Sequence, residues 1–394
     1  MKKNKSILCI HQGWELYGSD RSFLLNLQLF DKKLGKTHTL DIVIPRSGII
    51  VDELKKITAN IHFEEIGKVE RQEAKSKPFK SLLKILKSSP QCYRRMKEAD
   101  IVYINTIVPF GYLFGAFFFR KKVILHVREI PSKSAAIIFK YWFLLCRINV
   151  IFNSENTRDA FNMFRYKRGH VLLNAVEPIQ IKSIKEGEHS LINLLLLGRI
   201  NAWKGQDFFV DSFSKLDKSY QDKFRIRIVG DTPIGQEFYK ERLIQQIDDL
   251  RLAEKVELFP FTDDPLHHFN WADIVVVPST LPEPFGRVAV ESFSAKTPVI
   301  ASKHGGLKET VNNQNGWHFE PSEDNQLRII LAGPSSPLVS TSHPSSAAHS
   351  FSAGSQNSEW ACTALTRTAL TARTGASSSA LSTAAAAAPK LAAE

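Results

Sequence analysis

Two glutamates in the second half of the chain flank a glycine at a spacing that could serve ligand binding. Glu283 and Glu291 lie eight positions apart on either side of Gly286, in a stretch that predicts a strand ending at Pro278, then a loop and a helix. Free N–H groups at a helix start attract phosphate, and glycine lets the backbone approach a ligand closely. Each carboxylate could accept hydrogen bonds from sugar hydroxyls, one set on a transferred sugar and one on a ribose. The alternative is two solvated glutamates beside an ordinary turn.

Two basic residues further upstream could serve the same ligand. Arg199 and Lys204 follow the apolar run 191–197, which is typical of a strand buried on both faces. Two fixed cations there could neutralise a diphosphate leaving group as charge develops on it. A basic loop that merely closes a strand–helix turn is the alternative. The presence of the Glu283 stretch in the same half of the chain favours phosphate binding.

Candidates in the first half are weaker. Gly18 and Ser19 lie in a predicted loop, 12–20, and could offer backbone N–H groups to a phosphate. His126 ends a predicted strand, where a lone histidine is often structural.

Strand-like and helical segments alternate along most of the chain. The runs that predict strands are 6–11, 39–45, 100–105, 122–126 and 150–153, then 191–197, 225–229, 256–259, 274–278 and 299–301. Helical spacing covers about 21–30, 206–216, 236–250 and 288–295, and a further helix starts near 155. This alternation predicts an α/β fold with parallel sheets, in which ligands bind beyond the carboxyl ends of the strands.

The length of 394 residues suggests two domains. We place them at 1–178 and 179–331, because the polar segment 178–190 is typical of a linker. Residues 332–394 are rich in Ala, Ser, Thr and Pro, which predicts a disordered tail.

The net charge of +12 and the pI near 9.4 favour an anionic partner. The basic stretch Lys68–Lys97 also contains apolar residues at helical spacing, so it predicts an amphipathic helix suited to an anionic membrane surface. A helix packed on its own domain with a wet basic face is the alternative. Nucleic acid is disfavoured, because no recognisable nucleic-acid module is present. A short initial apolar run, four cysteines without a C-x-x-C pair and no long apolar segment predict a cytoplasmic protein.

The stretch from Pro278 to Ala301 resembles the E-x(7)-E signature of retaining GT-B glycosyltransferases, especially family four, or glycosyl transferases group 1. The likeness continues through His304-Gly-Gly306, Asn315-Gly316 and Phe319-Glu-Pro321, and upstream through G-R-x-x-x-x-K-G at 198–205. It implies the GT-B fold of two Rossmann-like domains facing across a cleft. It implies His126 and Glu283 as catalytic residues, no metal, and no cofactor beyond the donor substrate. The implied donor-binding residues are Gly18, Ser19, Arg199, Lys204, Gly230, Phe261, Phe285, Gly286, Arg287, Val288 and Glu291.

The implied reaction transfers a sugar from a nucleotide diphosphate sugar to an acceptor hydroxyl with retention. The expected role is bacterial surface polysaccharide synthesis, such as O-antigen or capsule, on a lipid-linked or saccharide acceptor. The expected location is the cytoplasm, with peripheral attachment to the inner face of the plasma membrane. Two alternatives remain open. The helix that ends GT-B enzymes is replaced by Ala/Ser-rich sequence, which suits a non-catalytic nucleotide-sugar-binding protein, and nucleotide-sugar epimerases share the fold.

Overall fold

The computed structural model describes residues 5–68, 76–120, 122–177 and 191–333, which form two compact units divided between Val176 and Glu177. The linker predicted at 178–190 and the predicted tail from 334 onward lie outside the described residues. Among the helices of the described ranges, none combines the length and the apolar character needed to cross a membrane.

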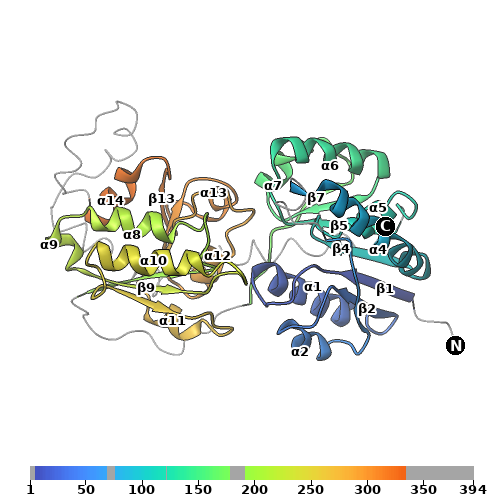
Figure 1. Cartoon of the computed structure of the whole chain (residues 1–394), viewed down its shortest axis with the longest axis horizontal. Coiled ribbons are helices and arrows are strands. Elements are labelled where there is room, and N and C mark those ends of the chain that lie inside the picture. The colour runs from blue at the N-terminus through green and yellow to red at the C-terminus, as the bar shows by residue number, and fades with distance from the viewer. Residues whose placement is uncertain (1–4, 69–75, 121, 178–190, 334–394) are drawn as a thin grey trace. The chain divides into compact units, whose positions relative to one another are not determined.

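The described part of the first unit is built on a seven-stranded sheet in the order β3-β2-β1-β4-β5-β6-β7, with every pairing parallel. The strands are β1 (Lys5–Ile10), β2 (His38–Ile44), β3 (Ile61–Phe63), β4 (Ile101–Asn105), β5 (Val123–Val127), β6 (Asn149–Phe152) and β7 (Gly169–Val171) (Figure 1). Because the strands are parallel, their carboxyl ends share one edge.

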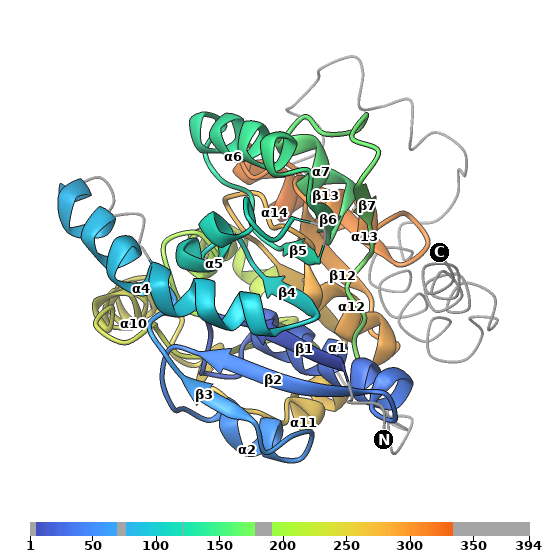
Figure 2. The ribbon, with the colours of Figure 1, turned by 90° about the vertical axis from the view of Figure 1, so that its right-hand side faces the viewer.

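Helices cover both faces of this sheet, because successive strand residues point to opposite sides. Ile7 and Cys9 pack in one core with α1 (Gly18–Leu34) and α2 (Ile50–Lys55). Leu8 and Ile10 pack in another core with α4 (Pro78–Glu98), α5 (Phe110–Gly115), α6 (Lys133–Cys146) and the end of α7 (Glu155–Ala160). Figure 2 shows α4, α5 and α6 together on one side of the strands, with α5 in the middle.

The described part of the second unit holds a six-stranded parallel sheet in the order β10-β9-β8-β11-β12-β13. Its strands are β8 (Ile192–Leu197), β9 (Phe224–Val229), β10 (Val256–Phe259), β11 (Ile274–Val277), β12 (Val299–Ser302) and β13 (Gly316–Phe319). On one face lie α8 (Gln206–Ser214), α10 (Phe238–Asp249) and α14 (Asp324–Ala332). The other face carries α11 (Leu266–Trp271), α12 (Arg287–Ser294) and α13 (Leu307–Thr310). The short α9 (Lys218–Gln221) leads into β9.

The predicted α/β class with parallel sheets is confirmed, and each predicted strand is found within two residues of its expected ends. The predicted start of the first helix was wrong: the helix begins at Gly18 rather than near Arg21, so Gly18 and Ser19 form its first turn. The edge strands β3, β7 and β13 were missed because each has only three or four residues and at most one fully buried side chain. Helix α14 was missed because it adjoins the Ala/Ser-rich segment.

Candidate functional site

Loops at the carboxyl edge of the second sheet touch one another through glycines. Gly230, after β9, has φ +148°, and a Cβ atom there would lie 2.0 Å from the carbonyl oxygen of Gly198, after β8. Gly205 has φ +75°, and a Cβ atom there would lie 1.9 Å from the carbonyl oxygen of Pro278, after β11. These approaches exclude any larger residue. The glycines therefore bring the loops carrying Arg199, Lys204 and Glu283 into contact.

Lys204 and the buried Glu283 form a partly buried ion pair across two of these loops. The Lys204 Nζ lies 2.7 Å from Glu283 Oε1, and Glu283 is only 4% exposed. The buried Ser279 hydroxyl donates to the same oxygen, and the ring of His304 donates from Nε2 to the Ser279 carbonyl at 2.6 Å. The sequence predicts that Lys204 and Glu283 contact the same ligand, and in the structure the two side chains contact each other directly.

Opposing effects set the pKa of Glu283. Burial alone would raise it, but the Lys204 ammonium and the hydrogen bonds from Lys204 and Ser279 outweigh burial and hold the pKa below its usual value. The carboxylate is therefore charged at neutral pH. Its charge is already balanced by a cation that could also meet a phosphate.

Helix α12 begins at the glycine that the sequence singled out. Gly286 is its N-cap with φ +85°, and a Cβ atom there would lie 2.5 Å from Leu307 Cδ2. Arg287 Nε lies 2.7 Å from Glu291 Oε1, one turn further along the helix. Phe285 is buried and Val288 half-buried. The helix start thus presents a positive dipole end beside an arginine–glutamate pair.

A carboxylate joins the next two loops. Asp231 Oδ2 accepts from the backbone N–H of Phe261 at 2.8 Å, and Lys240 Nζ lies 2.6 Å from Asp231 Oδ1. Burial opposes ionisation of Asp231, but the bonds from Lys240 and Phe261 lower its pKa overall. The loop after β10, which holds Phe261, is therefore fixed to the loop after β9, which holds Gly230.

Predicted residues of the first unit lie at the carboxyl edge of its sheet. Gly18 and Ser19 open the 17-residue helix α1, whose start is fixed by the buried Asp20. The Asp20 carboxylate accepts from the Tyr17 N–H at 3.0 Å and from His11 Nε2 at 2.7 Å. A Cβ atom at Gly13 would lie 1.8 Å from Asp20 Oδ1, so glycine at this position makes room for the carboxylate.

His126 sits in a buried polar network. Its Nδ1 lies 2.8 Å from the Tyr103 hydroxyl and accepts from Arg128, which can only donate, at 3.3 Å, so the neutral ring carries its proton on Nε2. That buried Nε2 has no hydrogen-bond partner in the described part of the chain. Burial, followed by the charge of Arg128, lowers the pKa of His126 well below its usual value. His126 is therefore neutral, and its Nε2–H is available to donate a hydrogen bond.

Sequence reasoning missed the residues that hold this network together. Asn105 accepts from Arg128 Nε at 2.6 Å and contacts His11 Nδ1 at 2.8 Å, and Arg128 also donates to Asn174. His11, Asn105 and Arg128 are polar residues at or just after the ends of three apolar strands. That position at a shared sheet edge is the signal that could have found them. Ser154, just after β6, caps α7 by accepting from the Thr157 N–H at 2.9 Å.

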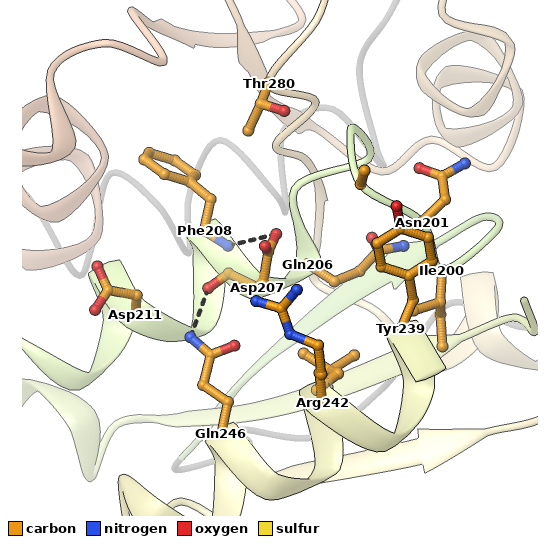
Figure 3. A pocket seen from close by; sticks show the side chains of 12 residues that line it. Ile200, Asn201, Gln206, Asp207, Phe208, Asp211, Tyr239, Arg242, Gln246 and Thr280 are labelled. Atoms are coloured by element: carbon orange, nitrogen blue, oxygen red, sulfur yellow. Dashed lines mark hydrogen bonds between the residues drawn. The ribbon is translucent and has the colours of Figure 1, made fainter. Parts of the chain in front are cut away.

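A separate pocket of about 580 Å³ opens beside α8 and α10 in the second unit (Figure 3). Its lining includes Tyr239 and Arg242 of α10, and Gln246 donates across it to the Asp207 carbonyl at 3.0 Å. Thr280, in the loop that also carries Glu283, lines this pocket, and its N–H donates to the Trp203 carbonyl at 2.8 Å. Its lining contains none of the predicted donor-binding side chains.

Comparisons with known proteins agree with this geometry. Residues 179–330 match the family described as glycosyl transferases group 1. D-inositol 3-phosphate glycosyltransferase of Geodermatophilus obscurus is 32% identical over 130 residues, covering 30% of this chain and 28% of that protein. Lipopolysaccharide 1,2-N-acetylglucosaminetransferase of Salmonella typhimurium is 30% identical over 140 residues, covering 34% and 36%. The chain thus spans about a third of the length of these curated relatives.

The fold matches solved structures over a longer range. The crystal structure of Anabaena HepE in complex with UDP and glucose has a TM-score of 0.67 and 22% identity, covering 83% of this chain and 88% of that one. Two parallel-sheet units with this likeness confirm the predicted GT-B fold. The chain therefore has the GT-B architecture, and its residues 179–330 match the glycosyl transferases group 1 family.

Proposed function

We propose that this protein is a retaining glycosyltransferase that moves a sugar from a nucleotide diphosphate sugar to an acceptor hydroxyl. The observation that carries the proposal is the ion pair of Lys204 with the buried Glu283 at the carboxyl edge of the second sheet, inside the group 1 region. A buried carboxylate paired with a lysine from another loop suits a site that binds an anionic ligand, because the lysine can also contact the negative charge that develops on that ligand.

The donor diphosphate would lie at the amino end of α12, where the Gly286 turn exposes backbone N–H groups. Arg199 and Lys204 would neutralise the charge that develops on the leaving diphosphate, and Glu291 would accept from the ribose. Glu283 would accept from hydroxyls of the transferred sugar. His126 of the first unit stays a predicted catalytic residue, whose Nε2–H is available to donate to a ligand. Because two side-chain cations and a helix end serve the phosphates, no metal is required, and transfer should persist in EDTA.

We propose a uridine nucleotide as the first donor to test. The support is the fold likeness to HepE, whose crystal structures include complexes with UDP and glucose and with UDP-glucose. The Salmonella relative is named for lipopolysaccharide, and a Klebsiella pneumoniae relative lies in a cps region. We therefore propose a lipid-linked surface polysaccharide precursor as acceptor and a peripheral location on the inner face of the plasma membrane.

The test combines donor binding with turnover. UDP and UDP-sugars should raise the melting temperature, since a ligand that binds only the folded state stabilises it. Radiolabelled sugar should then pass from the donor to extracted membrane lipid. Lys204→Met should reduce both signals, whereas Lys215→Met, in the exposed pair with Asp211, should change neither.

Different results would favour the alternatives. Binding without turnover for every nucleotide sugar tried would indicate a non-catalytic binding protein. Release of an epimer or of free sugar without acceptor would indicate an epimerase. The absence of both donor binding and sugar transfer would contradict the proposed function.

A further inference from the structure

Helix α4 buries Ser81 and Ser88 and exposes most of its large apolar residues. The side facing the unit presents Ser81, Ser88, Cys92 and Met96, all at most 6% exposed. The side facing away carries Phe79 at 82%, Leu83 at 55% and Leu86 at 57% exposure. A helix that only covers its own domain turns its apolar stripe inward. The apolar side of α4 is therefore not used by the core of this unit.

Close packing, rather than leucine burial, fixes this orientation. A Cβ atom at Gly67 or at Gly111 would lie 2.7 Å from the Ser88 hydroxyl, so the helix meets bare backbone at that point. Further along, Arg95 Nε donates to Glu64 Oε1 at 3.0 Å. Rolling the helix to bury its leucines would break both contacts. The exposed apolar side is a fixed feature of the fold.

The exposed apolar surface continues from α4 onto α5 and α6. The rings of Tyr93 on α4 and Phe118, just after α5, lie 5.8 Å apart. Those of Phe114 on α5 and Trp142 on α6 lie 5.1 Å apart. Phe118 is 67% exposed and Ile138 on α6 is 69% exposed. We call this surface of α4, α5 and α6 the α4–α6 face, and Figure 2 shows the three helices adjoining one another.

The composition of the α4–α6 face selects one kind of partner. Residues 77–97 contain seven Lys or Arg and no Asp or Glu, and residues 133–147 contain three Lys or Arg and no Asp or Glu. Apolar side chains set among basic ones match the boundary of an anionic bilayer, where hydrocarbon and negative headgroups meet. A second copy of this face would instead bring like charges together. Contiguous apolar surface is rare on soluble monomers without a binding role.

We propose that the α4–α6 face docks the protein on an anionic lipid bilayer, with α4 lying in the plane of the headgroups. The inference deepens the proposed function, because a lipid-linked acceptor would be held in such a bilayer. The sequence predicted only the basic stretch 68–97 as a contact. The structure adds α5 and α6, and it shows that the apolar side of α4 is available.

Vesicle co-sedimentation of the full chain tests the proposal. The wild type should bind phosphatidylglycerol vesicles, bind phosphatidylcholine vesicles much less, and lose affinity as salt is raised. Phe79→Ser, Leu83→Ser and Leu86→Ser together should weaken binding about tenfold or more. Lys87→Glu combined with Lys140→Glu should weaken it in low salt. The control Ile234→Ser, at a residue of the second unit that is 76% exposed, should bind as the wild type does.

Other outcomes would overturn the proposal. One is absent binding of the wild type to phosphatidylglycerol vesicles, and another is unchanged binding of the triple variant. If light scattering shows a concentration-dependent dimer of the wild type that the triple variant lacks, and the wild type binds no vesicles, the face is a self-association surface instead. Unchanged melting and UDP stabilisation in the triple variant would show that it is folded. Failure of the proposed function looks different, because vesicle binding would remain while UDP stabilisation and sugar transfer would be absent.

Discussion

At the scale of single residues, the charge on Glu283 depends on Lys204. Lys204→Met would remove the cation that pairs with a carboxylate only 4% exposed. We therefore expect a loss of about 2–3 kcal/mol in the free energy of unfolding. The pKa of Glu283 is lowered in the folded state, so the pair stabilises at neutral pH and loses its effect as pH falls below the ordinary value of 4.5. The variant should therefore lose less stability in acid than the wild type.

Urea unfolding between pH 3 and pH 7 checks this expectation. Lys215→Met removes an exposed pair with Asp211 and should cost less than about 0.5 kcal/mol. Equal losses for the two lysine variants would show that the burial of Glu283 does not matter.

Glu129 titrates in the opposite sense. Burial raises the pKa of its carboxyl to about 7, although its Oε2 accepts from the N–H groups of Ile107 and Arg128, each at 3.2 Å. A raised carboxyl pKa means that the folded state holds the proton more tightly, so stability falls as pH rises from about 4.5 through 7. Glu129→Gln keeps an acceptor oxygen and removes the charge. The variant should avoid the loss of up to about 3 kcal/mol in the free energy of unfolding that the wild type undergoes between pH 5 and pH 8.

The measurement is the free energy of unfolding at several pH values between 5 and 8. Glu254→Gln, at an exposed position, should keep the wild-type pH dependence. If Glu129→Gln also keeps that dependence, the carboxyl of Glu129 is already ionised without cost in the folded protein.

Sequence reasoning anticipated which residues of the second unit lie together better than it anticipated the network of the first. Glu283 and Gly286 stand in one continuous motif whose spacing follows from one strand, one loop and one helix, and Lys204 stands in a second short motif after a strand. The partners of His126 come from separate strands, as Asn105 and Arg128 do. Their proximity depends on the strand order of the sheet, which local periodicity does not encode. The Ser279 and His304 contacts depend on the loops for the same reason.

At the scale of elements, Gly305 determines where the Glu283 loop lies. It has φ +60°, and a Cβ atom there would lie 2.4 Å from the Glu283 carbonyl oxygen and 2.6 Å from its nitrogen. Because both obstacles are backbone atoms, Gly305→Ala should displace the loop and cost about 2–4 kcal/mol. UDP stabilisation should decrease with it.

Gly235→Ala is the matched control, because Gly235 has φ +80° and a Cβ atom placed there would have nothing within 4 Å. It should show only the backbone strain, about 1 kcal/mol, and full UDP stabilisation. Urea unfolding and thermal shift measure both variants. A Gly305 variant that matches this control would show that the loop yields at little cost.

The alternation of strands and helices was also predictable from the sequence, because buried parallel strands are continuous apolar runs. The orientation of α4 was not. Its spacing indicates an amphipathic helix, but periodicity alone does not say which side meets the protein. Ser88 faces inward because Gly67 and Gly111 leave room only for a small side chain, and those glycines lie outside the helix.

At the scale of the whole molecule, each unit has its own hydrophobic cores. The two cores of the first unit draw on strands β1, β2, β4, β5 and β6, and those of the second draw on β8 to β13. None of these clusters mixes residues from both described units. Separate cores are the physical basis for separate cooperative transitions.

We therefore expect two unfolding transitions in calorimetry, and UDP should raise the one that belongs to the second unit. At a hundredfold excess over Kd the stabilisation should be about 2.7 kcal/mol. Two matched core variants assign the transitions. Leu196→Ala, at a residue 1% exposed in the second unit, should lower the UDP-sensitive transition, and Leu8→Ala, at one 2% exposed in the first, should lower the other. Each should cost about 2–5 kcal/mol. A single transition shifted by both variants and by UDP would show that the two units unfold together, and that binding at the second stabilises the entire chain.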